Sequence, residues 1–426
     1  MSLFLYNLFL ILYATGIQIA SLFNPKAKLW INGRENIFDE IKSKIKNQNP
    51  IAIGSKIIWM HCASLGEFEQ GRPVIENIRK IFPDYKIVLT FFSPSGYEIR
   101  KNYTGADMVL YLPMDGRRNA KKFIDSINPC LVIWVKYEYW YYYLTELKNR
   151  NIPVLLVSGI FREGQPFFKW YGAIWKKMLG SFSHLFVQTK AAADLLQQAG
   201  IHENVSISGD TRFDRVTDIA AAFEPLSQQL INFCAGSKVL VAGSTWEEDE
   251  AELIHYVKAH PEIKFIIAPH EVDKENLQNV KKEFHGSMLY SQIMSGQLQM
   301  DYTAHILIID NIGMLARLYY YADVTYVGGG FGESGIHNVL EAAVYGKPVI
   351  FGPEYEKAAE AEGLIETGGA FSINNALELE TILNNLFEND NHLQESGIAA
   401  KNYVYANRGA TKKIIKYIQE KRLLIN

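Results

Sequence analysis

The pattern of apolar and polar positions changes character along this chain. Beyond residue 25, short apolar runs of strand length alternate with segments whose apolar residues recur every three or four positions, as in amphipathic helices. Several runs are rich in valine and isoleucine, which is typical of strands buried on both faces of a parallel sheet. The pattern predicts strands at 57–60, 86–91, 108–111, 131–135, 154–157 and 185–187, and a second series at 238–241, 264–268, 306–309, 323–327 and 348–351.

Two series of strands that alternate with helices predict two α/β domains built from βαβ units. With 426 residues the chain is too long for one hydrophobic core and fits two domains of roughly 200 residues each. We therefore expect two Rossmann-like domains facing a central cleft, one over residues 25–214 and one over 215–426. Because open α/β sheets bind ligands at the carboxyl ends of their strands, chemistry is expected at that edge of each sheet.

The N-terminal segment differs from the rest because residues 1–24 carry no charged side chain. Residues 3–23 form an apolar run long enough to cross the hydrocarbon core of a bilayer, and the first charged residues after it, Lys26, Lys28 and Arg34, are basic. The run predicts a membrane-anchor helix over residues 1–24, with the remainder of the chain on the cytoplasmic side. Polar residues within it leave an interfacial helix, or a buried one, as alternatives to a spanning helix.

The charge balance is close to neutral, with 43 basic and 46 acidic residues. It gives no global electrostatic reason to bind nucleic acid. The 3 cysteines, Cys62, Cys130 and Cys234, match no metal-ligand or redox spacing, and their odd number argues against a disulfide framework. These features favour a protein of the reducing cytosol.

A carboxylate stands at the first predicted strand-to-helix turn. The strand at 57–60 leads into Ser64-Leu65-Gly66-Glu67, which precedes a helical segment. If Glu67 faces the cleft, its carboxylate can take the proton from an attacking hydroxyl, which is general base catalysis. A glutamate in the first turn of a helix also complements the helix dipole, and by itself this capping role is the more common one.

Two turns in the second half can approach a ligand closely. Gly243, Ser244 and Thr245 follow a predicted strand, and they can either hold a phosphate or cap the acidic helix after them. A glycine-rich stretch, 328–335, precedes a predicted helix on which Asn338 and Glu341 share a face. A carboxylate there can bind both hydroxyls of a ribose. The number of glycines favours ligand binding over packing alone.

Neither turn has the spacing of a Walker loop or of a dinucleotide fingerprint. The chain also lacks the Asp-x-Asp pair with which many nucleotide-sugar transferases hold a divalent cation, so we expect neither a metal nor another cofactor. The charge of a leaving group must then be met by helix N-termini and basic side chains. Arg212 is a candidate for this role, and a salt bridge to Asp210 or Asp214 is the structural alternative.

Several short motifs, taken in order, resemble the 3-deoxy-D-manno-octulosonic acid (Kdo) transferases of lipid A assembly, which have the bilobal GT-B glycosyltransferase fold. They are the N-terminal anchor, Ser64-x-Gly66-Glu67, Glu138-x-Trp140, residues 209–214, Pro269-His270, Gly313-Met314-Leu315, and residues 338–341 ahead of Gly346-Lys347-Pro348 and Gly352-Pro353. The resemblance spans nearly the whole chain. It departs from the family pattern at Pro269-His270, which lacks an intervening arginine, and at Arg212, which replaces a lysine.

The resemblance implies an inverting, metal-independent transfer of Kdo from CMP-Kdo to a lipid A precursor, lipid IVA, in lipopolysaccharide biosynthesis. It implies that Glu67 is the general base and that Glu138 and Arg212 stabilise the transition state. It also implies contacts to CMP from Pro269, His270, Gly313, Met314, Leu315, Asn338, Val339, Leu340 and Glu341. The implied partners are the CMP-Kdo donor, the lipid acceptor and membrane lipid, at the cytoplasmic face of the cell inner membrane.

Two other functions remain compatible with the sequence. A GT-B transferase or epimerase that uses a UDP-sugar has the same architecture, and thermal stabilisation by CMP but not by UDP separates the two possibilities. A membrane-tethered module that binds nucleotide sugars without turning them over is the non-enzymatic alternative.

Overall fold

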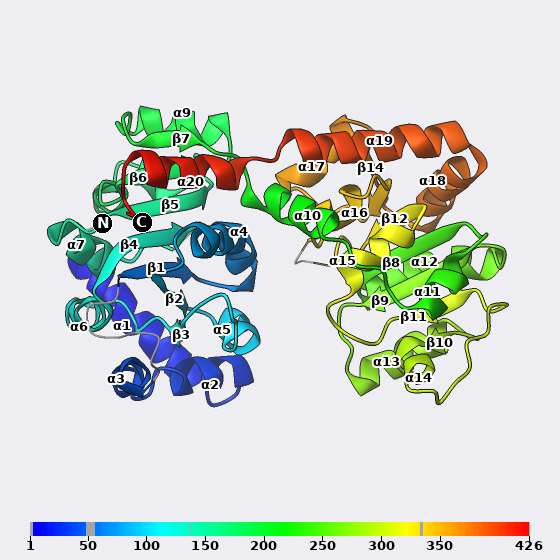
Figure 1. Cartoon of the computed structure of the whole chain (residues 1–426), viewed down its shortest axis with the longest axis horizontal. Coiled ribbons are helices and arrows are strands. Elements are labelled where there is room, and N and C mark those ends of the chain that lie inside the picture. Colours follow the sequence, from blue (N-terminus) through cyan, green and yellow to red (C-terminus); the bar gives the residue numbers. More distant parts are fainter. Residues whose placement is uncertain (1–2, 48–55, 137, 333–334, 426) are drawn as a thin grey trace. The chain divides into compact units, whose positions relative to one another are not determined.

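The computed structural model describes residues 3–47, 56–136, 138–332 and 335–425, which form two compact units (Figure 1). The first unit comprises Met1–Arg215 together with Arg408–Asn426, and the second comprises Val216–Asn407. Glu333 and Ser334, which belong to the glycine-rich stretch, lie outside the described residues.

The first unit is built on a parallel sheet with the strand order β3-β2-β1-β4-β5-β6-β7. This is the order of a Rossmann-like sheet, in which the chain starts in the middle and proceeds to one edge and then the other. The strands are β1 (Ile57–Cys62), β2 (Lys86–Phe91), β3 (Met108–Tyr111), β4 (Pro129–Val135), β5 (Val154–Gly159), β6 (His184–Val187) and β7 (Val205–Ile207). The helices are α1 (Leu3–Ala20), α2 (Pro25–Asn32), α3 (Ile37–Asn47), α4 (Leu65–Ile81), α5 (Pro94–Arg100), α6 (Arg117–Ile127), α7 (Tyr141–Asn149), α8 (Ala173–Leu179), α9 (Lys190–Gln198) and α20 (Ala410–Glu420), with a 3₁₀ turn at Pro166–Phe168; α10 (Thr211–Ala221) runs across the boundary between the units.

The second unit repeats this architecture with the strand order β10-β11-β9-β8-β12-β13-β14. Its strands are β8 (Val239–Thr245), β9 (Lys264–Pro269), β10 (Met288–Leu289), β11 (Ile306–Ile308), β12 (Val324–Val327), β13 (Val349–Phe351) and β14 (Ala370–Ser372). Its helices are α11 (Gln228–Cys234), α12 (Glu247–Ala259), α13 (Lys274–Glu283), α14 (Tyr290–Met294), α15 (Leu315–Leu318), α16 (Leu340–Ala343), α17 (Ala359–Glu366), α18 (Ala376–Glu388) and α19 (Asp390–Ala406), with a 3₁₀ turn at Tyr319–Tyr321.

The predicted pair of Rossmann-like α/β domains is confirmed, and every predicted strand is present. The strands that the pattern did not predict, β7, β10 and β14, are two or three residues long and lie at sheet edges. A strand at a sheet edge can form through only a few main-chain hydrogen bonds. Strands this short contain too few apolar residues to produce a recognisable run in the sequence.

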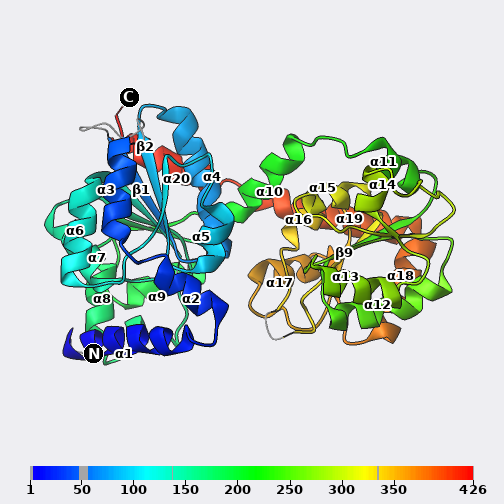
Figure 2. The same ribbon diagram turned by 90° about the horizontal axis from the view of Figure 1, so that it is seen from below.

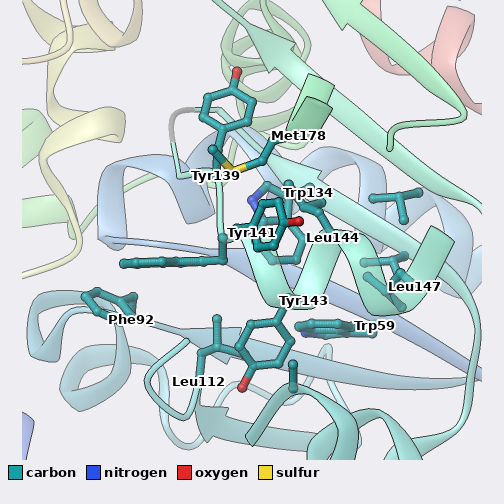
Figure 3. Close-up of a cluster of buried hydrophobic side chains, with 14 of the residues drawn as sticks. Trp59, Phe92, Leu112, Trp134, Tyr139, Tyr141, Tyr143, Leu144, Leu147 and Met178 are labelled. Atoms are coloured by element: carbon teal, nitrogen blue, oxygen red, sulfur yellow. The ribbon is translucent and has the colours of Figure 1, made fainter. Parts of the chain in front are cut away.

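The sheet of the first unit is buried on both faces. Alternate side chains of β1 lie in different hydrophobic clusters, with Trp59 in one and Ile58 and Met60 in the other. Figure 3 shows the first of these clusters, where the rings of Trp59 and Trp134 pack edge to face with centroids 5.5 Å apart. This packing fixes the direction in which β1 and β4 deliver their last residues.

The end of the chain does not follow the predicted domain boundary. The prediction assigned all of 215–426 to the second domain, whereas residues from Arg408 onward pack with the first unit. The apolar side chains of Ile414, Ile415 and Ile418 on α20 are buried in the same cluster as residues of α4. The Asp214 carboxylate also accepts hydrogen bonds from the N–H groups of Gly409 and Thr411, at 2.5 and 2.6 Å. Burial of this amphipathic helix therefore determines where it belongs.

The N-terminal helix α1 packs along one side of the first unit (Figure 2). It is long and apolar enough to cross a membrane, yet only 11% of its apolar window is buried within the protein. The Tyr6 hydroxyl donates a 2.6 Å hydrogen bond to Asp115 and accepts one from the N–H of Tyr141, while the Tyr142 hydroxyl donates to Asn7 at 2.7 Å. One face of α1 is thus bonded to the protein, and the opposite face exposes large apolar side chains.

Candidate active site

Glu67 lies in the first turn of α4, directly after β1. The Ser64 hydroxyl accepts a hydrogen bond from the N–H of Glu67, and the Glu67 carboxylate accepts one from the N–H of Ala63. This reciprocal pair is a capping box in which the carboxylate reaches one residue further back than usual. The capping role expected as the alternative is therefore present. It holds Glu67, which is only 8% exposed, at the carboxyl end of β1.

Gln70, one turn further along the same face of α4, was not predicted. It is 1% exposed, and its side-chain oxygen, in the orientation that satisfies the amide, accepts hydrogen bonds from Lys136 Nζ at 3.0 Å and Arg212 Nε at 3.2 Å. Its main-chain carbonyl accepts a 2.5 Å hydrogen bond from the Thr211 hydroxyl. One neutral side chain therefore joins two cations that come from separate parts of the chain.

Two residues at this edge of the sheet have left-handed backbone conformations without being glycine. Lys136, directly after β4, has φ of 61°, and Ser158, near the end of β5, has φ of 55°. Each such conformation costs on the order of 1 kcal/mol or more, and such strain tends to occur at functional sites. The Ser158 hydroxyl lies 3.1 Å from that of Thr211, which connects β5 to the start of α10.

Arg212 makes the salt bridge that was the structural alternative to a catalytic role. Its guanidinium Nε and one terminal nitrogen lie 2.8 and 2.7 Å from Asp210 Oδ2. The main-chain N–H of Arg212 donates a hydrogen bond to Asp210 Oδ1. Asp214 instead binds the N-terminus of α20. Because Asp210 and Gln70 both hold the guanidinium, its position at the carboxyl edge of the sheet is well defined.

Glu138 lies between the indole of Trp140 and the imidazole of His61. Its Oε2 lies 3.1 Å from His61 Nε2 and accepts a 3.1 Å hydrogen bond from the indole of Trp140. The other ring nitrogen of the fully buried His61 lies 2.9 Å from the Thr90 hydroxyl, which also accepts from the indole of Trp59 at 2.8 Å. His61, which was not predicted, therefore connects the Glu138 carboxylate to the buried Thr90 and orients it.

The three residues to which the resemblance assigned catalytic roles gather at one edge of the first sheet. Burial, and after it the charges of nearby carboxylates that include Glu67 and Glu138, raises the pKa of the Cys62 thiol at the end of β1. Both carboxylates thus act electrostatically on the same buried thiol. Arg212 joins them through Gln70, which shares a helix face with Glu67.

In the second unit, Asp249 ties the end of β8 to the glycine-rich stretch. Its carboxylate accepts hydrogen bonds from the N–H of Trp246 at 2.9 Å, the N–H of Gly329 at 2.8 Å and the hydroxyl of Tyr326 at 2.8 Å. Burial raises the pKa of Asp249, while these donors oppose the rise. The acid belongs to the predicted acidic first turn of α12, but its function here is to fix two loops.

A stacked cluster of three rings, which was not predicted, lies beside these loops. Trp246 and His337 lie 11° from coplanar, and the indole Nε1 donates a 3.1 Å hydrogen bond to His337 Nε2. His270 stacks on both rings, with centroid distances of 4.5 Å to each. Because its Nε2 accepts, His337 is neutral, and burial lowers its pKa to about 4. We call these three side chains the ring cluster.

Asn338 and Glu341 are adjacent, because Asn338 Nδ2 donates a 3.1 Å hydrogen bond to Glu341 Oε1, but they do not share a helix face, since Asn338 precedes α16. The predicted helix start beside the glycines is wrong, since α16 has only four residues and begins at Leu340. The N–H of Ile336 bonds to Glu354 and that of His337 to Gly328, which keeps the preceding segment out of the helix. A helix N-terminus therefore supplies no phosphate site here.

Packing accounts for much of the glycine-rich stretch. A Cβ atom on Gly328 would lie 2.3 Å from the Ser244 carbonyl oxygen, and one on Gly330 would lie 2.6 Å from the backbone of Gly352. Gly329 has φ of 94°, a conformation that favours glycine. The number of glycines alone therefore does not distinguish a ligand from packing, because close backbone contacts already require Gly328 and Gly330.

Among the possible phosphate contacts at the end of β8, only one offers an accessible side chain. A Cβ on Gly243 would lie 2.2 Å from the Tyr319 hydroxyl, so this glycine serves packing. The Thr245 side chain is 1% exposed and donates a 2.8 Å hydrogen bond to Glu250. Ser244, with φ of 55°, is half-buried and remains open to a ligand.

The other residues of the implied CMP site come from neighbouring strands. The carboxyl ends of β11, β9, β8 and β12 are adjacent in the sheet, which places Gly313, Pro269 and the glycine-rich stretch along one edge. His270 is exposed and Leu315 half-buried, whereas Met314, Val339 and Leu340 are buried, so the side chains of these last three are not accessible to a ligand. In the part of the chain that the structure describes, no three His, Cys, Asp or Glu side chains are grouped to hold a metal ion.

Comparison with known proteins identifies relatives of this chain. Residues 35–215 match the family model of the 3-deoxy-D-manno-octulosonic-acid transferases (kdotransferases). A 3-deoxy-D-manno-octulosonic acid transferase from Rickettsia felis is 27% identical over 79% of this chain and 73% of its own length. One from Chlamydia trachomatis is 25% identical over 86% of both chains. A bifunctional glycosyltransferase/methyltransferase from Fusobacterium nucleatum is 25% identical over 90% of this chain, which spans only 61% of that longer protein.

Solved structures confirm the fold. UDP-GlcNAc 2-epimerase from Neisseria meningitidis superposes with a TM-score of 0.59 at 15% identity, covering 86% of this chain and 100% of the other. A glycosyltransferase from Rickettsia africae gives a TM-score of 0.54 at 16% identity, covering 86% and 98%. The chain therefore has the architecture of GT-B proteins, and its sequence relatives indicate a glycosyltransferase.

Proposed function

We propose that this chain, a homologue of the Kdo transferases with their family domain at residues 35–215, transfers Kdo from CMP-Kdo to a lipid A precursor of the lipid IVA type. The observation that carries the proposal is the arrangement on α4. There Glu67 is fixed by a capping box, and Gln70, on the same helix face, binds the cations of Lys136 and Arg212. A base and two cations at one sheet edge suit the transfer of a glycosyl group to a hydroxyl.

In the proposed reaction the Glu67 carboxylate takes the proton from the acceptor hydroxyl. The hydroxyl oxygen then bonds to the anomeric carbon of Kdo as the bond from that carbon to the CMP phosphate oxygen breaks, and CMP leaves with the electron pair. A single displacement of this kind inverts the configuration of the anomeric carbon. The N–H of Ala63, a main-chain donor, orients the Glu67 carboxylate for this step.

Glu138 and Arg212 are proposed to stabilise the transition state. A carboxylate such as Glu138 favours the positive charge that develops on the sugar ring as the leaving group departs. His61 and Trp140 hold that carboxylate, and Asp210 holds Arg212, so both charges are positioned before the substrate arrives. Lys136 and Arg212 are proposed to meet the negative charge of the substrate without a divalent cation.

The second unit is proposed to bind the CMP part of the donor. Asn338 and Glu341, which are joined by a hydrogen bond and half-buried, suit the hydroxyls of a ribose. Ser244 and the exposed ring of His270 are the accessible polar groups at the ends of β8 and β9. Pro269, Gly313, Met314, Leu315, Val339 and Leu340 complete the proposed contacts, several of them through the main chain.

We propose that α1 lies in the membrane surface rather than across the bilayer, at the cytoplasmic face of the inner membrane. Tyr6 and Asn7 on one face bond to Asp115 and Tyr142, and a helix held in this way cannot be surrounded by lipid. Exposed residues on the other face, such as Phe4 and Leu12, are free of this constraint and suit the acyl region. This location would bring the enzyme to a lipid acceptor.

The test is an assay of the purified full chain with CMP-Kdo and tetra-acylated lipid A precursor in the presence of a chelator, with products identified by mass spectrometry. We expect a product that carries Kdo, and CMP but not UDP should raise the thermal unfolding temperature. Stabilisation by UDP alone would support a transferase or epimerase that uses a UDP-sugar. Stabilisation by CMP without any product would support a binding module.

A further inference from the structure

A cavity of about 610 Å³ lies between α1 and the rest of the first unit, and its lining includes none of the residues proposed for catalysis. This volume falls within the range of small-molecule sites. Ile11 contributes to the apolar side of its wall, while Arg34, Asp39, Asn119 and Lys122 are polar or charged. A wall of this mixed character fits an amphiphile better than water or a purely apolar ligand.

Arg34 is a partly buried cation in the cavity wall, and main-chain oxygens hold its guanidinium. The Arg34 guanidinium donates hydrogen bonds to the main-chain oxygens of Leu112, Trp30 and Phe92 at 2.9, 3.0 and 2.7 Å, and the structure gives it no ion pair among the described residues. It lies 3.8 Å from the ring centroid of Trp30. Burial lowers its pKa to about 9, which leaves it charged at neutral pH. The charges of Tyr111 and Glu138 oppose this lowering. A partly buried cation that makes no direct ion pair gains free energy when an anion binds next to it.

A second polar group at the same wall lacks a partner altogether. Trp30 is 7% exposed, and its indole N–H is one of the buried donors for which the described structure contains no acceptor. Buried donors are nearly always satisfied, so an unsatisfied one indicates a missing water, ion or ligand. Trp30 and Arg34 both line the cavity. The neighbouring Lys122, whose Nζ lies 4.0 Å from the ring centroid of Phe38, brings a further positive charge to it.

The cavity is next to the apolar surface of α1. Ile11 lines it and is 63% exposed, and the adjacent Leu12, which does not line it, is also 63% exposed. A ligand with a phosphate at the Arg34 and Lys122 end can therefore continue along α1 with an apolar chain. The bonds of Tyr6 to Asp115 and of Tyr142 to Asn7 hold α1 in place, so the site is preformed.

We infer that this cavity binds one glycerophospholipid of the surrounding membrane, with its phosphodiester at Arg34 and Lys122 and an acyl chain against Ile11. The lipid serves as a fixed attachment of α1 to the bilayer and not as a substrate. Charge complementarity and the continuous apolar surface of α1 favour this occupant. The inference needs α1 to meet a membrane, but it does not depend on the proposed sugar transfer, and its test contains no sugar donor.

The test uses the full chain purified in mild detergent, stripped of lipid, incubated with phosphatidylglycerol and examined by native mass spectrometry. Ile11→Trp fills the cavity, and Leu12→Trp adds the same ring to the next, equally exposed residue outside it. Lys122→Glu reverses a charge in the wall, and Lys121→Glu does the same at the exposed residue beside it. Thermal unfolding of each variant checks that it folds.

We expect the unaltered chain, Leu12→Trp and Lys121→Glu to hold one phospholipid, and Ile11→Trp and Lys122→Glu to bind it at least tenfold more weakly. Equal binding by all four variants would overturn the inference, because the lipid would then adhere to α1 without using the cavity. Displacement of the phospholipid by an equimolar lipid A precursor would also overturn it and identify the acceptor as the occupant. If Ile11→Trp fails to fold, Lys122→Glu and its control decide the outcome.

Discussion

The indole N–H of Trp246 donates a 3.1 Å hydrogen bond to Nε2 of His337, and the two rings lie 11° from coplanar beneath His270. This bond fixes the position of the His337 ring, on which His270, a proposed CMP contact, stacks. We predict that Trp246→Phe, which keeps a ring but loses the donor, weakens CMP binding about fivefold, the equivalent of one neutral hydrogen bond of about 1 kcal/mol. Isothermal titration calorimetry measures this change.

The control for that experiment is Trp170→Phe in the first unit, where the side chain is 95% exposed. It should leave the affinity for CMP unchanged. If Trp246→Phe, like Trp170→Phe, leaves the affinity for CMP unchanged, the ring cluster takes no part in nucleotide binding.

Glu250 should make the stability of the protein depend on pH. Burial raises its pKa to about 7, although the Thr245 hydroxyl bonds to it. The folded protein therefore binds this proton more tightly than the unfolded chain does, and the stabilisation is complete below pH 4.5 and lost as the pH rises through 7. Relative to the unaltered chain, Glu250→Gln should gain about 3 kcal/mol in unfolding free energy between pH 4 and pH 8.

Urea unfolding of the two proteins at several pH values measures the difference. Glu248→Gln, an exposed position in the same helix turn, should show no comparable gain. A constant difference between Glu250→Gln and the unaltered chain across this pH range would contradict the raised pKa.

Gln70 is predicted to act as a positioning residue. Gln70→Leu leaves Lys136 and Arg212 without their shared acceptor, so kcat should fall by about tenfold or more while KM for CMP-Kdo changes little. Gln70→Glu retains an acceptor and should recover part of the loss. Steady-state kinetics separate the two constants, and Asn77→Leu on the same helix is the control. An unchanged kcat in Gln70→Leu would show that the bridge serves stability alone.

The hydroxyl of Tyr6 is predicted to hold α1 on the first unit. Tyr6→Phe removes its hydrogen bonds to Asp115 and Tyr141 and should lower the unfolding free energy by about 1–2 kcal/mol. Limited proteolysis between α1 and α2 should become faster. Tyr13→Phe removes a hydroxyl on the same helix for which the described structure gives no hydrogen bond, and it should behave like the unaltered chain. Identical proteolysis of both variants would contradict the role of Tyr6.

The sequence predicted the fold better than the details of the site. Hydrophobic runs located the main strands because burial on both sheet faces imposes a strong local pattern. The end of the chain was assigned to the wrong unit, since the amphipathic pattern of α20 does not say which core will bury Ile414 and Ile418. The short edge strands were missed for lack of a pattern.

Within the site, motifs identified charged residues but not their supports. Glu67, Glu138 and Arg212 stand in recognisable segments, whereas Gln70 and His61 act through partners that are distant along the chain. A neutral or buried side chain gives no local signal of such a role. The glycines carry an ambiguous signal, because a stretch required by backbone packing has the same composition as one that cradles a ligand.

The central claim is that Glu67 is the general base, and a comparison of Glu67→Gln with Glu69→Gln tests it most directly. Both changes remove a carboxylate from α4, and Glu69 lies in surface ion pairs with Arg72 and Arg100. Single-turnover transfer from CMP-Kdo to the lipid acceptor, together with CMP binding, is measured for each. Glu67→Gln should bind CMP normally and lose at least the roughly 100-fold in rate that a general base contributes, while Glu69→Gln remains active. A near-normal rate in Glu67→Gln would contradict the account.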